Sequence, residues 1–320
     1  MAPLSVGVDL GGTNARAAVV DAESGAIVAS HKEPVRDRSP EKVVQVIRQA
    51  VARAGEAARL PAGPAGRVGV GVAGQVLGST GVVLNAPNLG WRDVPLGQLL
   101  GAALGAPVRI ANDLSVAAWG EKRFGAARGL DHVVLVFVGS GVGGGLILGG
   151  KLHEGASGVA GEIGHVKVRP ARPETQVRRC GCGQWGCLEA YTSGMNVAAR
   201  VREEIAAGAR TLVAERAGGD LSRVNASLVD EACRASDPYA VALWAEVSEL
   251  LGTAIANLVT LLNPDRVILG GGVLLGAPRL SELVSQAFDE AVSRSALRGL
   301  TVERAALGDD AGVIGAALLD

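Results

Sequence analysis

The sequence is organised around residues 161–189, which read GEIGHVKVRPARPETQVRRCGCGQWGCLE. Three of the four cysteines in the chain, Cys180, Cys182 and Cys187, lie within eight residues here, and His165 precedes the first of them by fifteen positions. Thiolate sulfur and imidazole nitrogen are the ligands that tetrahedral zinc prefers. We predict that these four residues form one closed Cys3His site. Because four protein ligands leave no position for an activated water, the predicted zinc is structural.

The cysteines also allow a plainer interpretation, in which they are small buried apolar residues or disulfide partners. The pair Cys180 and Cys182 is too close to bridge comfortably, and the glycines between the three thiols suit a metal site better than a core. Cys233 stands alone in a helical stretch and is expected to be a buried apolar residue.

Length, charge and hydropathy limit the class to which the protein can belong. The chain has 320 residues and a net charge of −1, so nothing in its overall charge favours binding to nucleic acid or to an anionic membrane. Its start lacks the basic and apolar regions of a signal peptide, and no uncharged apolar stretch is long enough to span a bilayer. We expect a soluble cytoplasmic protein with reduced thiols.

The two halves of the chain open in the same way. Residues 6–20 read as a strand, a glycine turn and a returning strand, and residues 133–148 repeat this pattern around Gly139-Ser140-Gly141. This predicts two related halves in an α/β layer architecture. The expected strands are 5–10, 14–21, 26–30, 68–73, 108–111, 133–138, 142–148 and 266–269, and the expected helices are 40–54, 96–104, 114–122, 196–207, 212–216, 227–234, 238–262 and 311–319.

The first glycine turn is a candidate phosphate site. In the run Asp9-Leu10-Gly11-Gly12-Thr13-Asn14, glycines would let a phosphate approach backbone N–H groups, and the Thr13 and Asn14 side chains add donors. An ordinary tight hairpin is the alternative, but Gly139, Ser140 and Gly141 form a second such turn. Two Gly-x-Gly-x-x-Gly runs, at 69–74 and 139–144, do not open helices, which argues against a dinucleotide-binding fold.

Several polar residues could act on a ligand. Asp113 follows Asn112 at the end of an expected strand, where it could be catalytic or could merely cap the next helix. Asn88 is either a turn residue or a hydrogen-bonding group. Glu162 and Glu189 flank the cysteine stretch, and they are either solvated charges or partners for a polyhydroxylated ligand, whose hydroxyl groups each need a hydrogen-bond partner.

Taken together, these motifs resemble the ROK family of sugar kinases and sugar-responsive repressors. The resemblance rests on the runs 9–13, 112–113, 161–165 and 180–189, which occur in that family's order and cover essentially the whole chain. It implies the actin-, Hsp70- and hexokinase-like (ribonuclease H-like) α/β fold, with two domains, a cleft between them and a structural zinc loop. The implied domains are a smaller one, 1–118 with the C-terminal helix 309–320, and a larger one, 119–308.

The resemblance also implies ATP-dependent phosphorylation of a hexose at its 6-hydroxyl, with glucose as the expected substrate. Asp113 would be the general base. The sugar would be held by Asn88, Asn112, Asp113, Glu162, His165 and Glu189. ATP with Mg²⁺ would be held by Asp9, Gly11, Gly12, Thr13, Asn14, Gly139, Ser140, Gly141, Gly271 and Gly272. Many members of the family are homodimers, so a homodimer is expected.

Other activities stay open at this stage. N-acetylglucosamine, N-acetylmannosamine, fructose, mannose and allose are alternative substrates, and polyphosphate is an alternative donor. A sugar sensor without turnover is a further alternative. Repressors of the family carry a helix-turn-helix domain ahead of the first turn, whereas only eight residues precede Asp9 here, so we expect no such domain.

Overall fold

The computed structural model describes residues 3–60, 66–170 and 176–319, and the chain divides into two compact units. The first unit comprises Met1–Leu135, Gly145–Gly161 and Arg304–Asp320, and the second comprises Val136–Gly144 and Glu162–Glu303. The domain limits inferred from the sequence stay a prediction.

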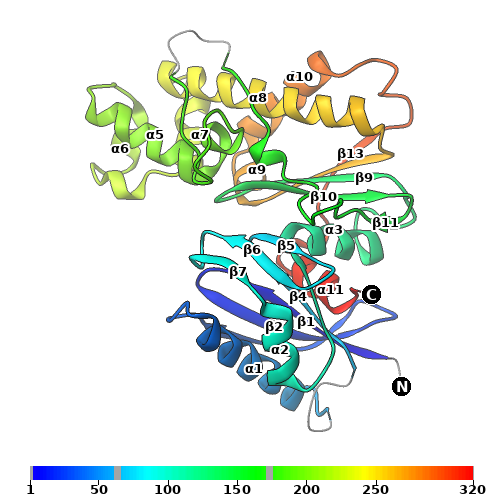
Figure 1. The fold of residues 1–320 in the computed structure, drawn as a ribbon. Coiled ribbons are helices and arrows are strands. Elements are labelled where there is room, and N and C mark those ends of the chain that lie inside the picture. The colour runs from blue at the N-terminus through cyan, green and yellow to red at the C-terminus, as the bar shows by residue number, and fades with distance from the viewer. Residues whose placement is uncertain (1–2, 61–65, 171–175, 320) are drawn as a thin grey trace. The chain divides into compact units, whose positions relative to one another are not determined.

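A five-stranded sheet in the order β3-β2-β1-β4-β8 forms the centre of the first unit (Figure 1). Its strands are β1 (Leu4–Leu10), β2 (Asn14–Asp21), β3 (Ile27–Pro34), β4 (Val68–Val72) and β8 (Val108–Asn112). Strands β1, β2 and β3 form the expected antiparallel meander, whereas β1, β4 and β8 run parallel. Strand β3 runs four residues beyond the predicted end at Ser30, because its pairing with β2 continues to Pro34.

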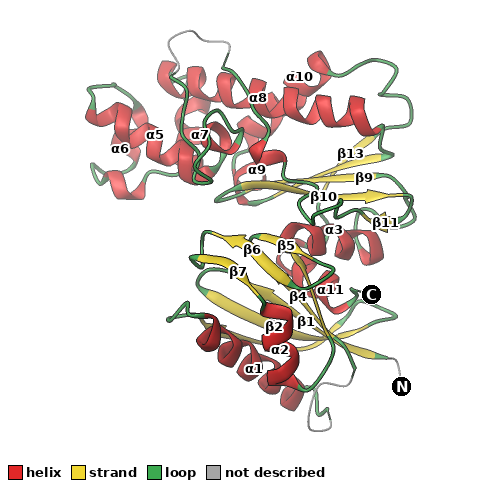
Figure 2. Cartoon of the chain, in the orientation of Figure 1, coloured by secondary structure: helices red, strands yellow, loops and turns green. Residues whose placement is uncertain are grey.

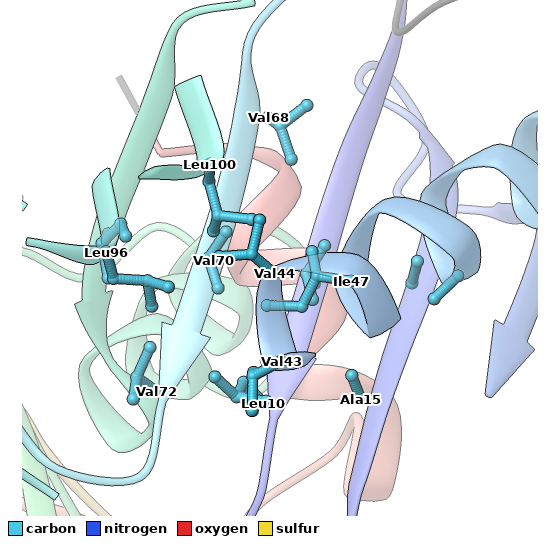
Figure 3. Packing of buried hydrophobic residues seen from close by; sticks show 14 of the residues in the cluster. Leu10, Ala15, Val43, Val44, Ile47, Val68, Val70, Val72, Leu96 and Leu100 are labelled. Atoms are coloured by element: carbon cyan, nitrogen blue, oxygen red, sulfur yellow. The ribbon is translucent and has the colours of Figure 1, made fainter. Parts of the chain in front are cut away.

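Helices cover both faces of this sheet. On one face, α1 (Pro40–Ala57) and α2 (Leu96–Leu104) pack against the strands in a large cluster of buried apolar residues (Figure 3). Helix α1 begins with Pro40 in its first turn, as predicted, and its expected apolar side is buried: Val43, Ile47, Ala50, Val51 and Ala54. Full burial of one side chain such as Ile47 contributes about 1.5–3 kcal/mol.

On the other face lie α3 (Asp113–Phe124) and α11 (Ala311–Ala317). Two strand glycines allow α11 to approach the sheet closely. A Cβ added at Gly7 would lie 2.0 Å from the Val313 carbonyl oxygen, and one added at Gly69 would lie 1.8 Å from that of Ala316. The C-terminal helix is therefore packed directly on the backbone of β1 and β4.

A small antiparallel sheet also belongs to the first unit, and the sequence did not indicate it. It consists of β5 (Gln75–Leu77), β6 (Val82–Ala86) and β7 (Trp91–Val94). None of its three strands is among those expected from the sequence. Such short strands carry too few alternating residues to be recognised, since β7 buries only Trp91 and Val94.

The second five-stranded sheet has the order β11-β10-β9-β12-β13. Its strands are β9 (Val133–Val138), β10 (Val142–Leu148), β11 (Lys151–Leu152), β12 (Arg266–Gly270) and β13 (Thr301–Arg304). In each half of the chain the third, second, first, fourth and fifth strands of the sheet lie side by side in this order. The identical strand order supports the predicted internal repeat.

Helices make up most of the second unit (Figure 2). They are α4 (Glu189–Thr192), α5 (Gly194–Ala206), α6 (Leu212–Arg216), α7 (Ala226–Arg234), α8 (Pro238–Leu262), α9 (Gly272–Gly276) and α10 (Pro278–Ala291). Helices α4, α9 and α10 were missing from the sequence prediction. For α10 a signal was present, because Pro278 opens the helix and Leu280, Val284 and Phe288 recur every four residues on its buried side.

Helix α8 is the one helix among the described residues with the length and apolar composition to cross a membrane. However, 56% of its most apolar window is buried inside the protein, and it packs against α7 and α10. The core helix of a soluble protein meets the same criterion.

Candidate active site

The parallel strands of the first unit bring two of the predicted motifs to one edge of the sheet. Leu10 on β1 is in register with Val72 on β4, which is in register with Asn112 on β8. The turn that starts at Gly11 therefore follows the carboxyl end of β1, and Asp113 follows the carboxyl end of β8. Only β4 lies between these two strands in the sheet. This is the edge at which parallel α/β sheets bind ligands.

Asn112, and not Asp113, caps helix α3. Its Oδ1 accepts hydrogen bonds from the backbone N–H groups of Leu114, at 2.9 Å, and Ser115, at 3.1 Å. Its Nδ2 donates to the Gly74 carbonyl oxygen at 3.0 Å. Asp113 is the first helical residue, and its Oδ1 accepts from the Leu114 N–H at 3.0 Å. The alternative in which Asp113 serves only as the cap is wrong, because a neighbour has that role.

This arrangement assigns different tasks to the two side chains. The Asp113 carboxylate is half-buried at the positive end of α3, where the helix dipole favours a negative charge. The Asn112 oxygen accepts both of its hydrogen bonds from the helix backbone. One of the two N–H groups of its amide donates to Gly74, so the other is left for a ligand.

The first glycine turn is held by its surroundings. Gly11 donates its backbone N–H to the Asn14 carbonyl at 3.0 Å, and the Arg38 Nε donates to the Gly12 carbonyl at 3.1 Å. A Cβ on Gly12 would lie 3.1 Å from both the Cβ and the carbonyl oxygen of Asn88. Asn88, which has an exposed side chain, thus lies directly against the turn, as a shared ligand site requires.

Asp9 precedes this turn and is largely buried. Burial raises the pKa of the Asp9 carboxyl above its ordinary value of 3.8, although the positive charges of Arg16 and Lys32 act in the opposite direction. Arg16 also forms an ion pair with Asp310 at 2.6 Å, next to the start of α11. Asp9 is therefore a carboxylate that is costly to ionise without a cation beside it.

The second glycine turn is fixed in the same manner within the second unit. Gly139 donates its N–H to the Gly141 carbonyl at 2.9 Å, and its own carbonyl accepts from the Gly194 N–H at 2.8 Å, at the start of α5. Glu189 completes the arrangement, because its Oε2 accepts from the Val142 N–H at 2.9 Å. A Cβ on Gly141 would lie 2.7 Å from this oxygen, so a side chain there would displace the Glu189 carboxylate.

The four predicted metal ligands converge in the second unit. The ligand atoms of His165, Cys180, Cys182 and Cys187 all lie within 4.8 Å of one another. The Cys182 and Cys187 sulfurs are 3.7 Å apart, and the Cys180 sulfur is 3.9 Å from His165 Nδ1. Zn–S bonds of about 2.3 Å in a tetrahedron place two sulfurs about 3.8 Å apart. The four side chains thus fit a tetrahedral zinc ion, and the disulfide alternative is not realised, since all three are free thiols.

Glu162 and His165 flank this cluster. Glu162 Oε2 lies 3.7 Å from His165 Nε2, while the other ring nitrogen of His165 faces Cys180. Burial raises the pKa of the Glu162 carboxyl, His165 lowers it and Glu189 raises it further. Gly164 permits this packing, because a Cβ there would lie 2.1 Å from the Val142 carbonyl oxygen. The 161–165 segment therefore packs against the strand that follows the second glycine turn.

A cavity of about 700 Å³ opens beside this second turn. Three residues of the predicted nucleotide site are among its lining residues: Gly139, Ser140 and Gly272. Gly271 does not line the cavity; its φ of 90° and its contact with the Val138 backbone explain the glycine there. The remaining lining residues were not predicted. They lie on α5, on α7 and directly before it, and on α9: Gly194, Met195, Ala198, Arg202, Val224, Asn225, Ala226, Ser227 and Val273. No short motif marks them.

The comparisons with known proteins agree with this geometry. The sequence profile described as "ROK family" matches residues 5–320. The chain belongs to the ROK family. A ROK family glucokinase from Streptomyces griseus, solved in complex with glucose and AMPPNP, is 36% identical, with a TM-score of 0.77 and 98% of both chains covered.

Two other relatives of the ROK family are informative. The glucokinase of Streptomyces coelicolor is 34% identical over 317 residues, which are 98% of this chain and 96% of that protein. The bifunctional enzyme NanE/NanK of Brucella suis is 37% identical over 252 residues, which are 78% of this chain and 42% of that protein. The two-domain hexokinase-like fold expected from the sequence is confirmed by the ROK family structures.

Proposed function

We propose that the protein transfers the γ-phosphoryl group of ATP to the 6-hydroxyl of glucose, producing glucose 6-phosphate and ADP. The observation that carries this proposal is the Asp113 carboxylate at the end of β8, next to the helix cap Asn112, in a chain 34% identical to a glucokinase over 98% of its length. A carboxylate at the carboxyl end of a parallel strand lies where such sheets bind ligands, as a general base requires.

In the proposed reaction, the Asp113 carboxylate accepts the proton of the sugar's 6-hydroxyl as that oxygen attacks the γ-phosphorus. The bond between the γ-phosphorus and the bridging oxygen breaks, and ADP leaves with the electron pair. Asn112 keeps Asp113 in place through the helix cap and its bond to Gly74. Phosphoryl transfer depends mainly on positioning and on charge neutralisation, which suits a site of few reactive groups.

The remaining predicted residues have binding roles in this proposal. Asn88, Asn112, Glu162, His165 and Glu189 hold the sugar hydroxyls. The turns at 11–14 and 139–141 hold phosphates through backbone N–H groups, and the cavity beside Ser140 and Gly272 holds the nucleoside. Mg²⁺, which neutralises charge on the phosphates, would be held near Asp9, whose buried carboxylate needs a cation partner.

Zinc has a structural role in the proposal. His165 and the three cysteines would hold it, and it would fix the segment that carries Glu162 and the start of α4 that carries Glu189. We also propose that the enzyme works in the cytoplasm and forms a homodimer, as expected from the family resemblance. The reduced thiols of the chain agree with the location.

An N-acetylmannosamine or N-acetylglucosamine kinase is the second candidate, as the sequence left it open, and relatives other than glucokinases, such as the bifunctional enzyme NanE/NanK, are also similar to the chain. A coupled ADP-release assay with MgATP separates the candidates, using glucose, the two N-acetylated sugars, mannose, fructose and allose. The proposal expects the highest kcat/KM with glucose. A higher value for another sugar reassigns the substrate, and sugar binding without turnover of any of them favours a sensor or a different phosphoryl donor.

A further inference from the structure

The cavity beside the second glycine turn has one polar side chain whose purpose the proposed function leaves open. Four of its lining residues have hydrogen-bonding or charged side chains: Ser140, Arg202, Asn225 and Ser227. Asn225 caps α7 by accepting from the Leu228 N–H at 3.0 Å and donates to the Arg223 carbonyl at 3.2 Å. The Ser227 hydroxyl donates to the Gly276 carbonyl at 3.1 Å.

Ser140 belongs to the turn itself, so Arg202 is the remaining polar group. Among the described residues, Arg202 has neither an ion pair nor a side-chain hydrogen bond, although it is half-buried. The neighbouring Arg200 on the same helix differs, because it is paired with Glu204 and Glu246. A half-buried guanidinium in a cavity without a carboxylate partner is suited to a ligand.

The position of Arg202 along α5 indicates which part of a nucleotide it meets. The helix starts at Gly194, whose N–H bonds to Gly139 in the phosphate turn. Arg202 lies eight residues further on, which is about 12 Å along the helix axis. The phosphates would bind at the turn and the positive end of α5. Arg202 therefore lies toward the opposite end of the cavity, where the base of the nucleotide would reach.

The walls around Arg202 suit a flat apolar ring. Ala198, Val224, Ala226 and Val273 line the cavity and are each less than 9% exposed. A purine ring offers a π face and ring nitrogens that accept hydrogen bonds. A guanidinium can stack on the face and donate N–H groups to the edge, whereas no other side chain of these walls carries a charge.

We propose that Arg202 binds the base of the donor nucleotide and so distinguishes a nucleoside triphosphate from a bare polyphosphate chain. This inference rests on the proposed function, because it assigns the cavity to the phosphoryl donor. Arg202 would determine affinity for the donor and would leave the transfer step itself unchanged.

The test compares two ligands that share phosphates and differ in the base. Calorimetry measures the binding of ADP and of tripolyphosphate to the wild type, to Arg202→Met and to Arg210→Met. Methionine keeps the apolar length of the side chain and removes the charge. Arg210 is the matched control, because it is exposed, follows α5 and does not line the cavity.

Arg202→Met should bind ADP about tenfold more weakly and bind tripolyphosphate as the wild type does. In turnover, the KM for ATP should rise by a similar factor, with kcat and the KM for the sugar unchanged. Arg210→Met should match the wild type throughout. Equal weakening of both ligands places Arg202 at the phosphates and overturns the proposal, as does unchanged ADP binding.

The same experiment separates this inference from the proposed function. A wild-type protein that phosphorylates no sugar, yet binds ADP in a manner that depends on Arg202, leaves the base-binding role intact and removes the kinase assignment. If the wild-type protein phosphorylates a sugar with ATP, and Arg202→Met changes neither ADP binding nor the KM for ATP, the kinase assignment stands and the base-binding role is removed.

Discussion

Glu189 accepts a hydrogen bond from the backbone N–H of Val142 at 2.9 Å. Glu189 lies two residues after Cys187, a predicted zinc ligand, and Val142 directly follows the turn 139–141. One carboxylate thus links the predicted metal-binding loop to the second glycine turn within the second unit. Its other oxygen lies 3.5 Å from the Cys180 sulfur.

This link predicts that Glu189→Ala affects the donor nucleotide as well as the sugar. Val142 is buried, so its N–H would lose a charged partner, at a cost of about 1–3 kcal/mol in the free energy of unfolding. We expect a lower Tm and higher KM values for both ATP and glucose. Glu203→Ala is the control, since Glu203 is 62% exposed in a surface ion pair with Arg178. Wild-type KM for ATP in Glu189→Ala contradicts the link.

Asp113→Asn should abolish turnover without loss of the fold. An amide cannot take the proton of the 6-hydroxyl, so kcat should fall by about 10²–10⁴-fold or more. Glucose affinity measured by calorimetry should change little, because the amide keeps its size. Asp289→Asn, on the exposed side of α10, should keep full activity. Retained kcat in Asp113→Asn would refute the role of Asp113 as base.

Asn112→Ala should lower stability and activity together. The variant removes the N-cap of α3 and the bond to Gly74, so the free energy of unfolding should fall by about 1–2 kcal/mol. Asn112→Ser keeps a capping oxygen and should recover most of the stability, as urea denaturation can measure. If Ser and Ala are equally destabilising, the cap is not the main contribution of Asn112.

Asp9→Asn should stabilise the protein at neutral pH while impairing activity. The pKa of Asp9 is raised by burial, so the folded state binds more protons than the unfolded state as pH rises past 3.8. Ionisation therefore opposes folding at neutral pH. The variant removes this penalty, and its advantage in urea denaturation should disappear as pH falls below 3.8.

Asp21→Asn is the control of opposite sign for Asp9. The backbone N–H groups of Ser24 and Glu23 lower the pKa of the Asp21 carboxyl. Its ionised form therefore favours folding, and Asp21→Asn should reduce stability at neutral pH, an effect that is lost as pH falls through the lowered pKa. Two variants that respond to pH in the same direction would contradict the assignment.

Cys182→Ser should reduce zinc content, stability and glucose affinity at once. Loss of one ligand weakens the site that holds Glu162 and His165. Elemental analysis after a chelator wash should find about one zinc per wild-type chain and much less in the variant. Cys233→Ala, which removes a buried thiol outside the cluster, should keep its zinc. Equal zinc content in both variants would refute the ligand assignment.

Local sequence patterns were sufficient for much of the fold and for the metal site. The apolar spacing of α1 and α8, the glycine turns at 11–12 and 139–141, and the cysteine spacing each depend on residues that are neighbours in the chain. The three-stranded sheet β5-β6-β7 escaped prediction because its strands are stabilised by pairing with one another, and each is too short to show its own period.

The sequence by itself determined the residue types of the site, the repeat of strand, turn and strand, and the Cys3His set, because these depend on short-range spacing. Only the tertiary structure decided that Asn112 caps α3 rather than Asp113, since both residues cap helices well and the choice depends on Gly74, thirty-eight residues away. The tertiary structure alone also placed Arg202 in the cavity that Ser140 and Gly272 line. Such contacts depend on how distant elements pack, and no local pattern encodes that packing.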